Sequence, residues 1–241
     1  MWKLASLRCW NINQLTIETA SLISIYMTTP TQAPVPRRPG RPPKVPREHY
    51  DTRELLVRCG TEILTEQGFS ATGIDMILKR VGVPKGSFYH YFASKDAFGR
   101  ALLDNYAQYF ARKLDRWLLD ESVAPLERLL GFVEDAQKGM AKHDYRRGCL
   151  VGNLGQEISV LPEGYREAIE AVFADWQQRL SACLQAAQAS GDLPKEADCD
   201  ELAAFFWTGW EGAVLRARLV RNAQPMRTFV SGFLRSAFFQ M

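Results

Sequence analysis

The chain has few of the residues and patterns on which most enzymes, secreted proteins and membrane proteins depend. Its 241 residues include five cysteines, an odd number without a Cys-x-x-Cys pair, and only three histidines. This pattern disfavours a disulfide framework or a structural zinc site and is typical of a cytoplasmic protein. No apolar run reaches the roughly 18 residues that a membrane span requires. Gly-x-Ser-x-Gly, His-Glu-x-x-His, phosphate-loop and dinucleotide motifs are also missing, so the sequence predicts no catalytic site, metal or cofactor.

Period-2 alternation, the signal of a half-buried strand, is also missing over any useful length. Apolar residues recur instead at helical spacing. The hydrophobic share of 46% and the charged share of 24% indicate a globular fold with a buried core. The sequence predicts an all-α fold, with a long helix from Ser94 through Leu118 and further helices over 51–67, 74–81, 84–92, 125–141, 148–159, 163–190, 198–221 and 225–239.

Residues 1–47 differ from the rest of the chain in composition. Met27 opens a polar, proline-containing stretch, so we expect residues 1–26 to come from an upstream start; a short interfacial anchor is the alternative. Residues 28–47 hold seven of the twelve prolines and are expected to be extended. Arg38 and Arg41 lie in Arg-Pro-Gly-Arg-Pro-Pro-Lys, which resembles an AT-hook core suited to an A·T minor groove. A nonspecific basic linker is an equally open interpretation.

A helix-turn-helix pattern occupies residues 72–98. Apolar residues at i, i+3, i+4 and i+7 begin at Ile74 and form one face of a helix that ends at Gly82. Pro84 suits the first turn of a second short helix, and Ser94 suits the N-cap of the long third helix. Two short helices joined by a tight turn are typical of a motif whose second helix enters the DNA major groove.

The run Val-Gly-Val-Pro-Lys-Gly-Ser-Phe-Tyr-His-Tyr-Phe, followed by Ser94-Lys95, resembles the N-terminal domain of the TetR/AcrR family of bacterial repressors. The resemblance covers roughly residues 50–100. It implies a homodimer that binds a pseudo-palindromic double-stranded DNA operator and responds to a small-molecule effector. The expected parts are a basic extension (1–47), a helix-turn-helix domain (48–97) and a ligand-binding and dimerisation domain (98–241). The long helix would link the last two without a break.

The resemblance assigns DNA contacts to the second short helix and its surroundings. Lys85 is the only long cationic side chain on that helix and so the best candidate for reading guanine. Thr72 is expected to cap the first helix of the motif and to grip the DNA backbone together with Lys95. Phe88, Tyr91 and Phe92 are expected in the core. The expected DNA-binding set is Arg38, Arg41, Thr72, Lys85, Gly86, Ser87, Tyr89, His90 and Lys95.

A second constellation surrounds Cys149. A cysteine near a helix N-terminus, preceded by Arg146 and Arg147, would have a stabilised thiolate, as an electrophile or oxidant sensor requires. A buried small hydrophobic residue is the other interpretation. Together with Gly-Trp-Glu-Gly-Ala at 209–213, this segment resembles the acrylate-utilisation (AcuR) subgroup and electrophile-sensing members of the family. The resemblance implies a small carboxylate or an acrylate-like electrophile as effector, bound with or without reaction at Cys149.

The helix over 198–221 carries further candidates. Trp207 and Trp210 could line a ligand pocket or fill core, and Arg146, Arg147 or Arg216 could neutralise a carboxylate; the sequence does not choose. Small residues at 209–213 permit close helix packing at a subunit interface, opposite an apolar stripe over 226–237. The expected effector set is Cys149, Arg146, Arg147, Asn153, Trp207 and Trp210.

Three other functions compete with an effector-responsive repressor. A thiol-based redox or electrophile sensor would act through Cys149, and a cysteine-dependent enzyme would pair it with His143, six residues away. A constitutive architectural DNA binder would leave the C-terminal domain without a purpose. We expect the repressor and no enzymatic activity.

Overall fold

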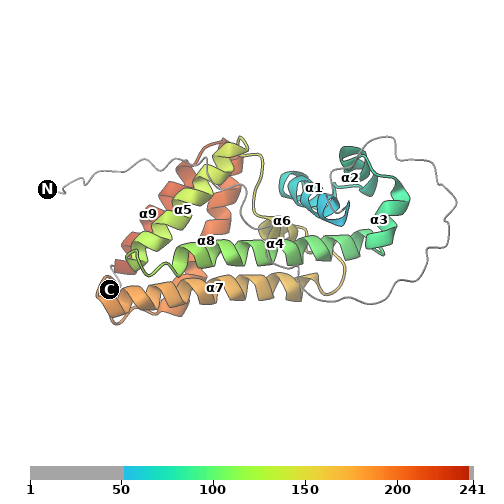
Figure 1. The fold of residues 1–241 in the computed structure, drawn as a ribbon. Coiled ribbons are helices and arrows are strands. Elements are labelled where there is room, and N and C mark those ends of the chain that lie inside the picture. Colours follow the sequence, from blue (N-terminus) through green and yellow to red (C-terminus); the bar gives the residue numbers. More distant parts are fainter. Residues whose placement is uncertain (1–51, 239–241) are drawn as a thin grey trace, which may run out of the picture. The chain divides into compact units, whose positions relative to one another are not determined.

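The computed structural model describes residues 52–238. Within this range the chain forms nine helices and no strand, which confirms the predicted all-α fold (Figure 1). The expected N-terminal extension, with Arg38 and Arg41, lies outside the described residues. The helices are α1 Thr52–Gln67, α2 Ile74–Val81, α3 Lys85–Tyr91, α4 Lys95–Leu118, α5 Pro125–Lys142, α6 Leu150–Gln156, α7 Tyr165–Ser190, α8 Cys199–Val220 and α9 Gln224–Phe238.

The turn between α2 and α3 forms as the sequence predicts. Gly82 adopts a left-handed conformation (φ 73°) that a side chain rarely takes, and its N–H donates to the Leu78 carbonyl. At the start of α4, the Ser94 hydroxyl accepts the Ala97 N–H at 3.0 Å, as an N-cap should. The cap predicted for α2 was wrong, because Gly73 occupies the N-cap position and makes no side-chain bond there.

Three aromatic rings form the centre of the helix-turn-helix core. Phe88 of α3 is fully buried, and its ring centroid lies 5.1 Å from that of Phe98 on α4. Phe92 packs against Phe98 at 4.8 Å. Tyr91 was expected in this core but is 37% exposed, because it lies on the outer face of α3 beside His90. The phenol therefore belongs to the surface of the predicted recognition helix.

Helices α4 and α7 lie side by side along much of their length (Figure 1). Both contact α5 and α6, and α8 packs between α7 and α9. An aromatic cluster fills the junction of α4, α7 and α8, where Trp176 lies 4.4 Å from Phe110 and 5.0 Å from Trp207 between ring centroids. Gly209 lets α8 approach α9 closely, because a Cβ there would collide with the Phe229 ring. None of the helices in the described range is long and apolar enough to span a lipid bilayer.

Candidate functional site

The outer face of α3 presents the side chains expected to meet DNA. Lys85 is 60% exposed and forms a surface ion pair with Asp75 of α2 at 3.4 Å. A Cβ on Gly86 would meet no atom within 4 Å, so this face of α3 is open. Lys95 lies over the Phe69 ring, 4.4 Å from its centroid. The exposed positions of the helix are Lys85, Gly86, Tyr89, His90 and Tyr91.

Thr72 occupies a different place from the expected one. Its hydroxyl donates to the Gly68 carbonyl at 2.6 Å, and the residue is only 1% exposed. This hydrogen bond joins the two ends of the loop that connects α1 to α2. The Thr72 side chain is therefore a structural part of that connection rather than a surface donor for phosphate.

A cavity of about 280 Å³ lies between the DNA-binding helices and the C-terminal helices. Its wall includes Thr61, Glu62 and Thr65 of α1, and the segment Arg147–Cys149 that precedes α6. Tyr106 of α4 and Glu211 of α8 line the same space. Because α1 supplies part of the wall, a molecule in this cavity would touch both regions of the chain.

Cys149 lines this cavity in an environment unlike the predicted one. Burial and the neighbouring Glu211 carboxylate raise the pKa of the Cys149 thiol well above its usual value. The Gly152 N–H donates to Sγ at 3.5 Å, which only partly offsets this effect. The expected stabilisation of a thiolate by Arg146 and Arg147 was wrong, because neither guanidinium is a neighbour that shifts the thiol. Burial and the Glu211 carboxylate thus disfavour the thiolate form of Cys149.

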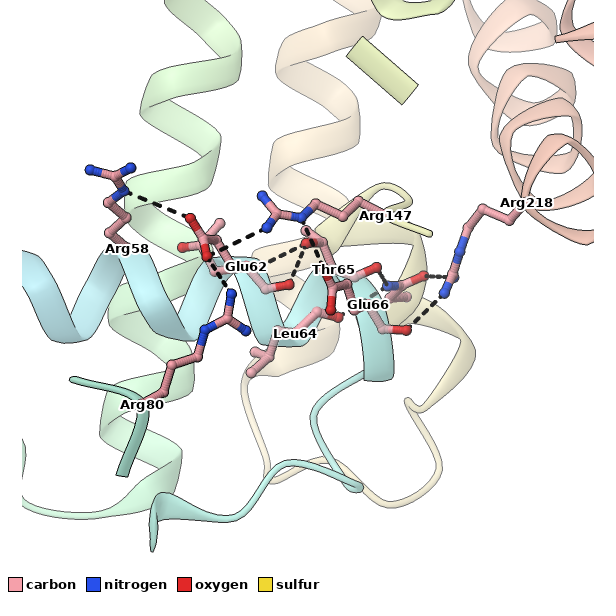
Figure 2. Close-up of polar contacts among 10 residues, drawn as sticks. Arg58, Glu62, Leu64, Thr65, Glu66, Arg80, Arg147 and Arg218 are labelled. Carbon is pink, nitrogen blue, oxygen red and sulfur yellow. Dashed lines mark hydrogen bonds and ion pairs between the residues drawn. The ribbon is translucent and has the colours of Figure 1, made fainter. Parts of the chain in front are cut away.

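Arg147 instead belongs to a polar cluster on α1. Its guanidinium pairs with Glu66 at 3.0 Å and with Glu62 at 3.4 Å. Glu62 also accepts from Arg80 of α2 at 2.9 Å, and Figure 2 shows Arg58, Arg80 and Arg147 converging on it. The cluster thus links the cavity wall to the first helix of the helix-turn-helix motif.

Asn153 and Arg218 hold the C-terminal end of α1. The last carbonyl groups of a helix lack partners within it and need donors from elsewhere. The Asn153 amide donates to the Leu64 and Thr65 carbonyls, each at 3.1 Å. Arg218 of α8 donates to the Glu66 carbonyl at 2.9 Å and to the Asn153 side-chain oxygen at 3.1 Å (Figure 2). Asn153 therefore caps α1 rather than facing the cavity.

Glu157 holds the connection that follows α1. Its two carboxylate oxygens accept the N–H groups of Phe69 at 2.8 Å and Ser70 at 2.7 Å. Gly68 makes this approach possible, because its left-handed backbone (φ 84°) suits glycine and a Cβ there would collide with Glu157. We call the contacts of Asn153, Glu157 and Arg218 with residues 64–70 the α1 clamp.

The other predicted effector residues are dispersed. Trp207 is 2% exposed and donates its indole N–H to the Trp176 carbonyl at 2.9 Å, so it is core. Trp210 lines the cavity. Arg146 is exposed and lies in a separate surface depression, and Arg216 lies in another.

Sequence reasoning assigned no role to four residues that the structure brings to this region: Tyr106, Glu157, Glu211 and Arg218. The available signal for Glu211 was a single acidic residue between Trp210 and Gly212 on a largely apolar helix. Its neighbour Cys149 comes from 62 positions earlier in the chain, and spacing alone does not predict that contact.

Glu211 makes folding stability depend on pH. Burial raises the pKa of this carboxyl to about 7, above its unfolded value near 4.5. Between these values the folded chain binds more protons than the unfolded chain, so stability falls as the pH rises. We expect the melting temperature to fall between pH 5.5 and pH 8 by about 4 °C more in the wild type than in Glu211→Gln. Calorimetry of both proteins at both pH values measures this; an equal fall would contradict it.

Both regions of the chain match known protein families. Residues 56–102 match the family described as "Bacterial regulatory proteins, tetR family", and residues 125–233 match "Tetracyclin repressor-like, C-terminal domain". The chain is 49% identical over 205 residues to the transcriptional regulator AcuR of Cereibacter sphaeroides, covering 85% of this chain and 93% of that protein. The chain belongs to the TetR family.

Other TetR-family members agree with this assignment. The transcriptional repressor DhaR of Mycobacterium sp. strain GP1 is 32% identical over 74% of this chain and 88% of its own. The crystal structure of a regulatory protein TetR from Rhodobacter sphaeroides matches with a TM-score of 0.74 and 52% identity, over 76% of this chain and 96% of that one. The chain is thus a helix-turn-helix DNA-binding transcriptional regulator and not an enzyme.

Proposed function

We propose that the protein is a homodimeric repressor in which residues 48–97 read a pseudo-palindromic operator and residues 98–241 bind an effector and dimerise. Two observations support the assignment of DNA binding and dimerisation to different parts of the chain. The outer face of α3 carries exposed donors, whereas α8 exposes apolar side chains, among them Phe205 at 49% and Leu219 at 70%. Exposed apolar residues of this size on one helix fit a subunit interface.

The cavity wall is built from both α1 and the segment before α6, and this arrangement supports the proposal. Thr65, Arg147 and Gly148 line the cavity, and the Gly148 N–H donates to the Thr65 carbonyl of α1 at 3.0 Å. Arg147 pairs with α1 from the same segment. An effector that displaces this segment would shift α1 and, through Arg80, the helix-turn-helix. The dimer population would shift toward a conformation in which the two α3 helices are no longer spaced to fit the two operator half-sites.

Charge in the cavity favours a neutral, reactive effector over a carboxylate. The two cations at its wall already have partners: Lys113 pairs with Asp135 at 2.7 Å, and Arg147 pairs with Glu62 and Glu66. Glu211 adds negative charge next to Cys149. A free carboxylate ligand would lack an unpaired cation there, whereas an uncharged electrophile needs no cation to balance its charge.

The test uses a DNA fragment that the purified full chain selects from a random-sequence pool. Fluorescence anisotropy would give its affinity before and after treatment with acrylamide, a neutral conjugated acceptor. We expect treatment to weaken operator binding by the wild type at least about fivefold and to leave Cys149→Ser unchanged. Binding without sequence preference would contradict the repressor, and an equal response of Cys149→Ser would contradict sensing at this thiol.

A further inference from the structure

Glu211 and Tyr106 lie against the Cys149 thiol inside the cavity. The first turn of α6 makes room for this group, because a Cβ on Gly152 would collide with Glu211 Oε2 and would lie 3.7 Å from Cys149 Cβ. Tyr106, Cys149 and Glu211 line the same cavity, and the proximity of Glu211 and Tyr106 shifts the pKa of the Cys149 thiol. Among residues 52–238, Glu211 takes part in no salt bridge. Its charge acts on both Cys149 and Tyr106, whose pKa values it raises.

We propose that Glu211 is the proton acceptor with which Cys149 adds to neutral conjugated carbonyl compounds. The inference rests on the proposed function, because it takes Cys149 as the reacting group of the effector cavity. The sulfur forms a bond to the β-carbon of the acceptor, and the electron pair of the carbon–carbon double bond moves to the α-carbon. The S–H proton passes to Glu211 and then to the α-carbon. The product is a thioether, and the step needs no oxidant or reductant.

The environment of the thiol explains why a base is needed. Burial and the adjacent carboxylate keep the pKa of Cys149 high, so little thiolate exists near neutral pH. A carboxylate that accepts the proton while the S–C bond forms avoids that unfavourable state. Burial also raises the pKa of Tyr106 well above its usual value, so its hydroxyl stays protonated. It can therefore donate to the sulfur as charge develops.

Glu211 is better placed for this role than the other titratable groups around the cavity. His143 lines the cavity too, but the charges that shift its pKa are those of Arg147, Lys142, Glu62 and Glu66, and not that of Cys149. Burial lowers the pKa of His143, which makes it a weaker base. The charged or titratable groups that line the cavity are Glu62, Tyr106, Tyr109, Lys113, His143, Arg147, Cys149 and Glu211.

The same carboxylate selects among acceptors by charge. An anionic acceptor such as acrylate would bring a second negative charge next to Glu211, whereas acrylamide has the same conjugated skeleton without the charge. Like charges at close range in a partly buried site disfavour each other strongly. The rate of each acceptor with Cys149 is divided by its rate with N-acetylcysteine to correct for intrinsic reactivity. This ratio should be larger for acrylamide than for acrylate.

The experiment follows alkylation of Cys149 in the full chain by peptide mass spectrometry between pH 6 and pH 8.5. The wild-type rate with acrylamide should rise with pH and level off above about pH 7, where Glu211 is ionised. Glu211→Gln should be at least about tenfold slower at pH 7.5, and its rate should keep rising with pH. Gly152→Ala, which forces the carboxylate away while keeping its charge, should be slowed in the same way. His143→Gln is the matched control and should keep the wild-type profile.

The outcomes separate this inference from the proposed function. A Glu211→Gln protein that reacts as fast as or faster than wild type would overturn the inference, since Glu211 would then only suppress the thiolate. Operator release by the resulting adduct would still support the proposed function. Adducts that form with the expected Glu211 dependence but leave operator binding unchanged would support the base and contradict the sensor. Loss of acrylate discrimination in Glu211→Gln would confirm the selection by charge.

Discussion

Reversing the charge of Lys85 should lower the affinity for the selected operator by at least about 100-fold. Lys85 is 60% exposed on the outer face of α3, and a dimer would present it twice, once in each half-site. Loss of a cation that contacts a base or phosphate costs roughly 1–3 kcal/mol per site, and Glu in its place adds repulsion from the DNA. Anisotropy titrations of Lys85→Glu at several salt concentrations would measure the loss, and the salt dependence should become shallower.

Lys138→Glu is the matched control for this substitution. Lys138 is 72% exposed on α5 and pairs with Glu134. Lys138→Glu therefore makes the same charge change at a similarly exposed, ion-paired lysine that lies outside the helix-turn-helix. Equal losses from both variants would indicate only a general effect of net charge. Melting temperatures should change little in either case, because exposed ion pairs stabilise a fold by at most about 1 kcal/mol.

Replacing Glu157 by Gln should loosen the connection between α1 and α2 and weaken communication with the cavity. The carboxylate accepts two backbone N–H groups, from Phe69 and Ser70, whereas an amide of the same size offers one acceptor and one donor. One N–H would then face another donor. Hydrogen bonds to charged groups contribute about 1.5–3 kcal/mol each, so the free energy of unfolding should fall by roughly that amount.

Three measurements would establish the role of Glu157. Urea unfolding gives the stability, and amide hydrogen exchange should be faster at residues 68–73 than in the wild type. The ratio of operator affinities before and after acrylamide treatment should shrink at least about threefold. Exposed Glu163, in the segment before α7, supplies the control Glu163→Gln. Unchanged exchange at 68–73 in Glu157→Gln would rule out the α1 clamp as a stabilising contact.

Local patterns predicted the helices well, because each depends on residues close together in the chain. The apolar face that begins at Ile74, the left-handed Gly82 and the Ser94 cap all formed as the sequence indicates. The error at Thr72 arose because its hydroxyl found a partner in the preceding loop, Gly68, which propensity rules do not weigh. Tyr91 was misplaced because a seven-residue helix makes only about two turns, too few for periodicity to define its buried face well.

The environment of Cys149 could not be predicted in the same way. The chain places two arginines just before it, and sequence proximity suggested that they stabilise a thiolate. Arg147 turns instead to Glu62 and Glu66, 81 or more positions away, and Glu211 arrives at the thiol from α8. Contacts at such separations depend on how whole helices pack. The sequence therefore predicted a lowered pKa for the Cys149 thiol, whereas in the structure that pKa is raised.

The sequence by itself determined the fold class, the helix-turn-helix and the family. These follow from helical periodicity, glycine and proline positions, and a dense run of residues on one short segment. Only the tertiary structure decided that Asn153 caps α1, that Trp207 is core, and that Cys149 shares its cavity with Glu211 and Tyr106. The physical reason is that periodicity fixes which face of a helix is buried, whereas the partner of that face is chosen by packing with distant helices.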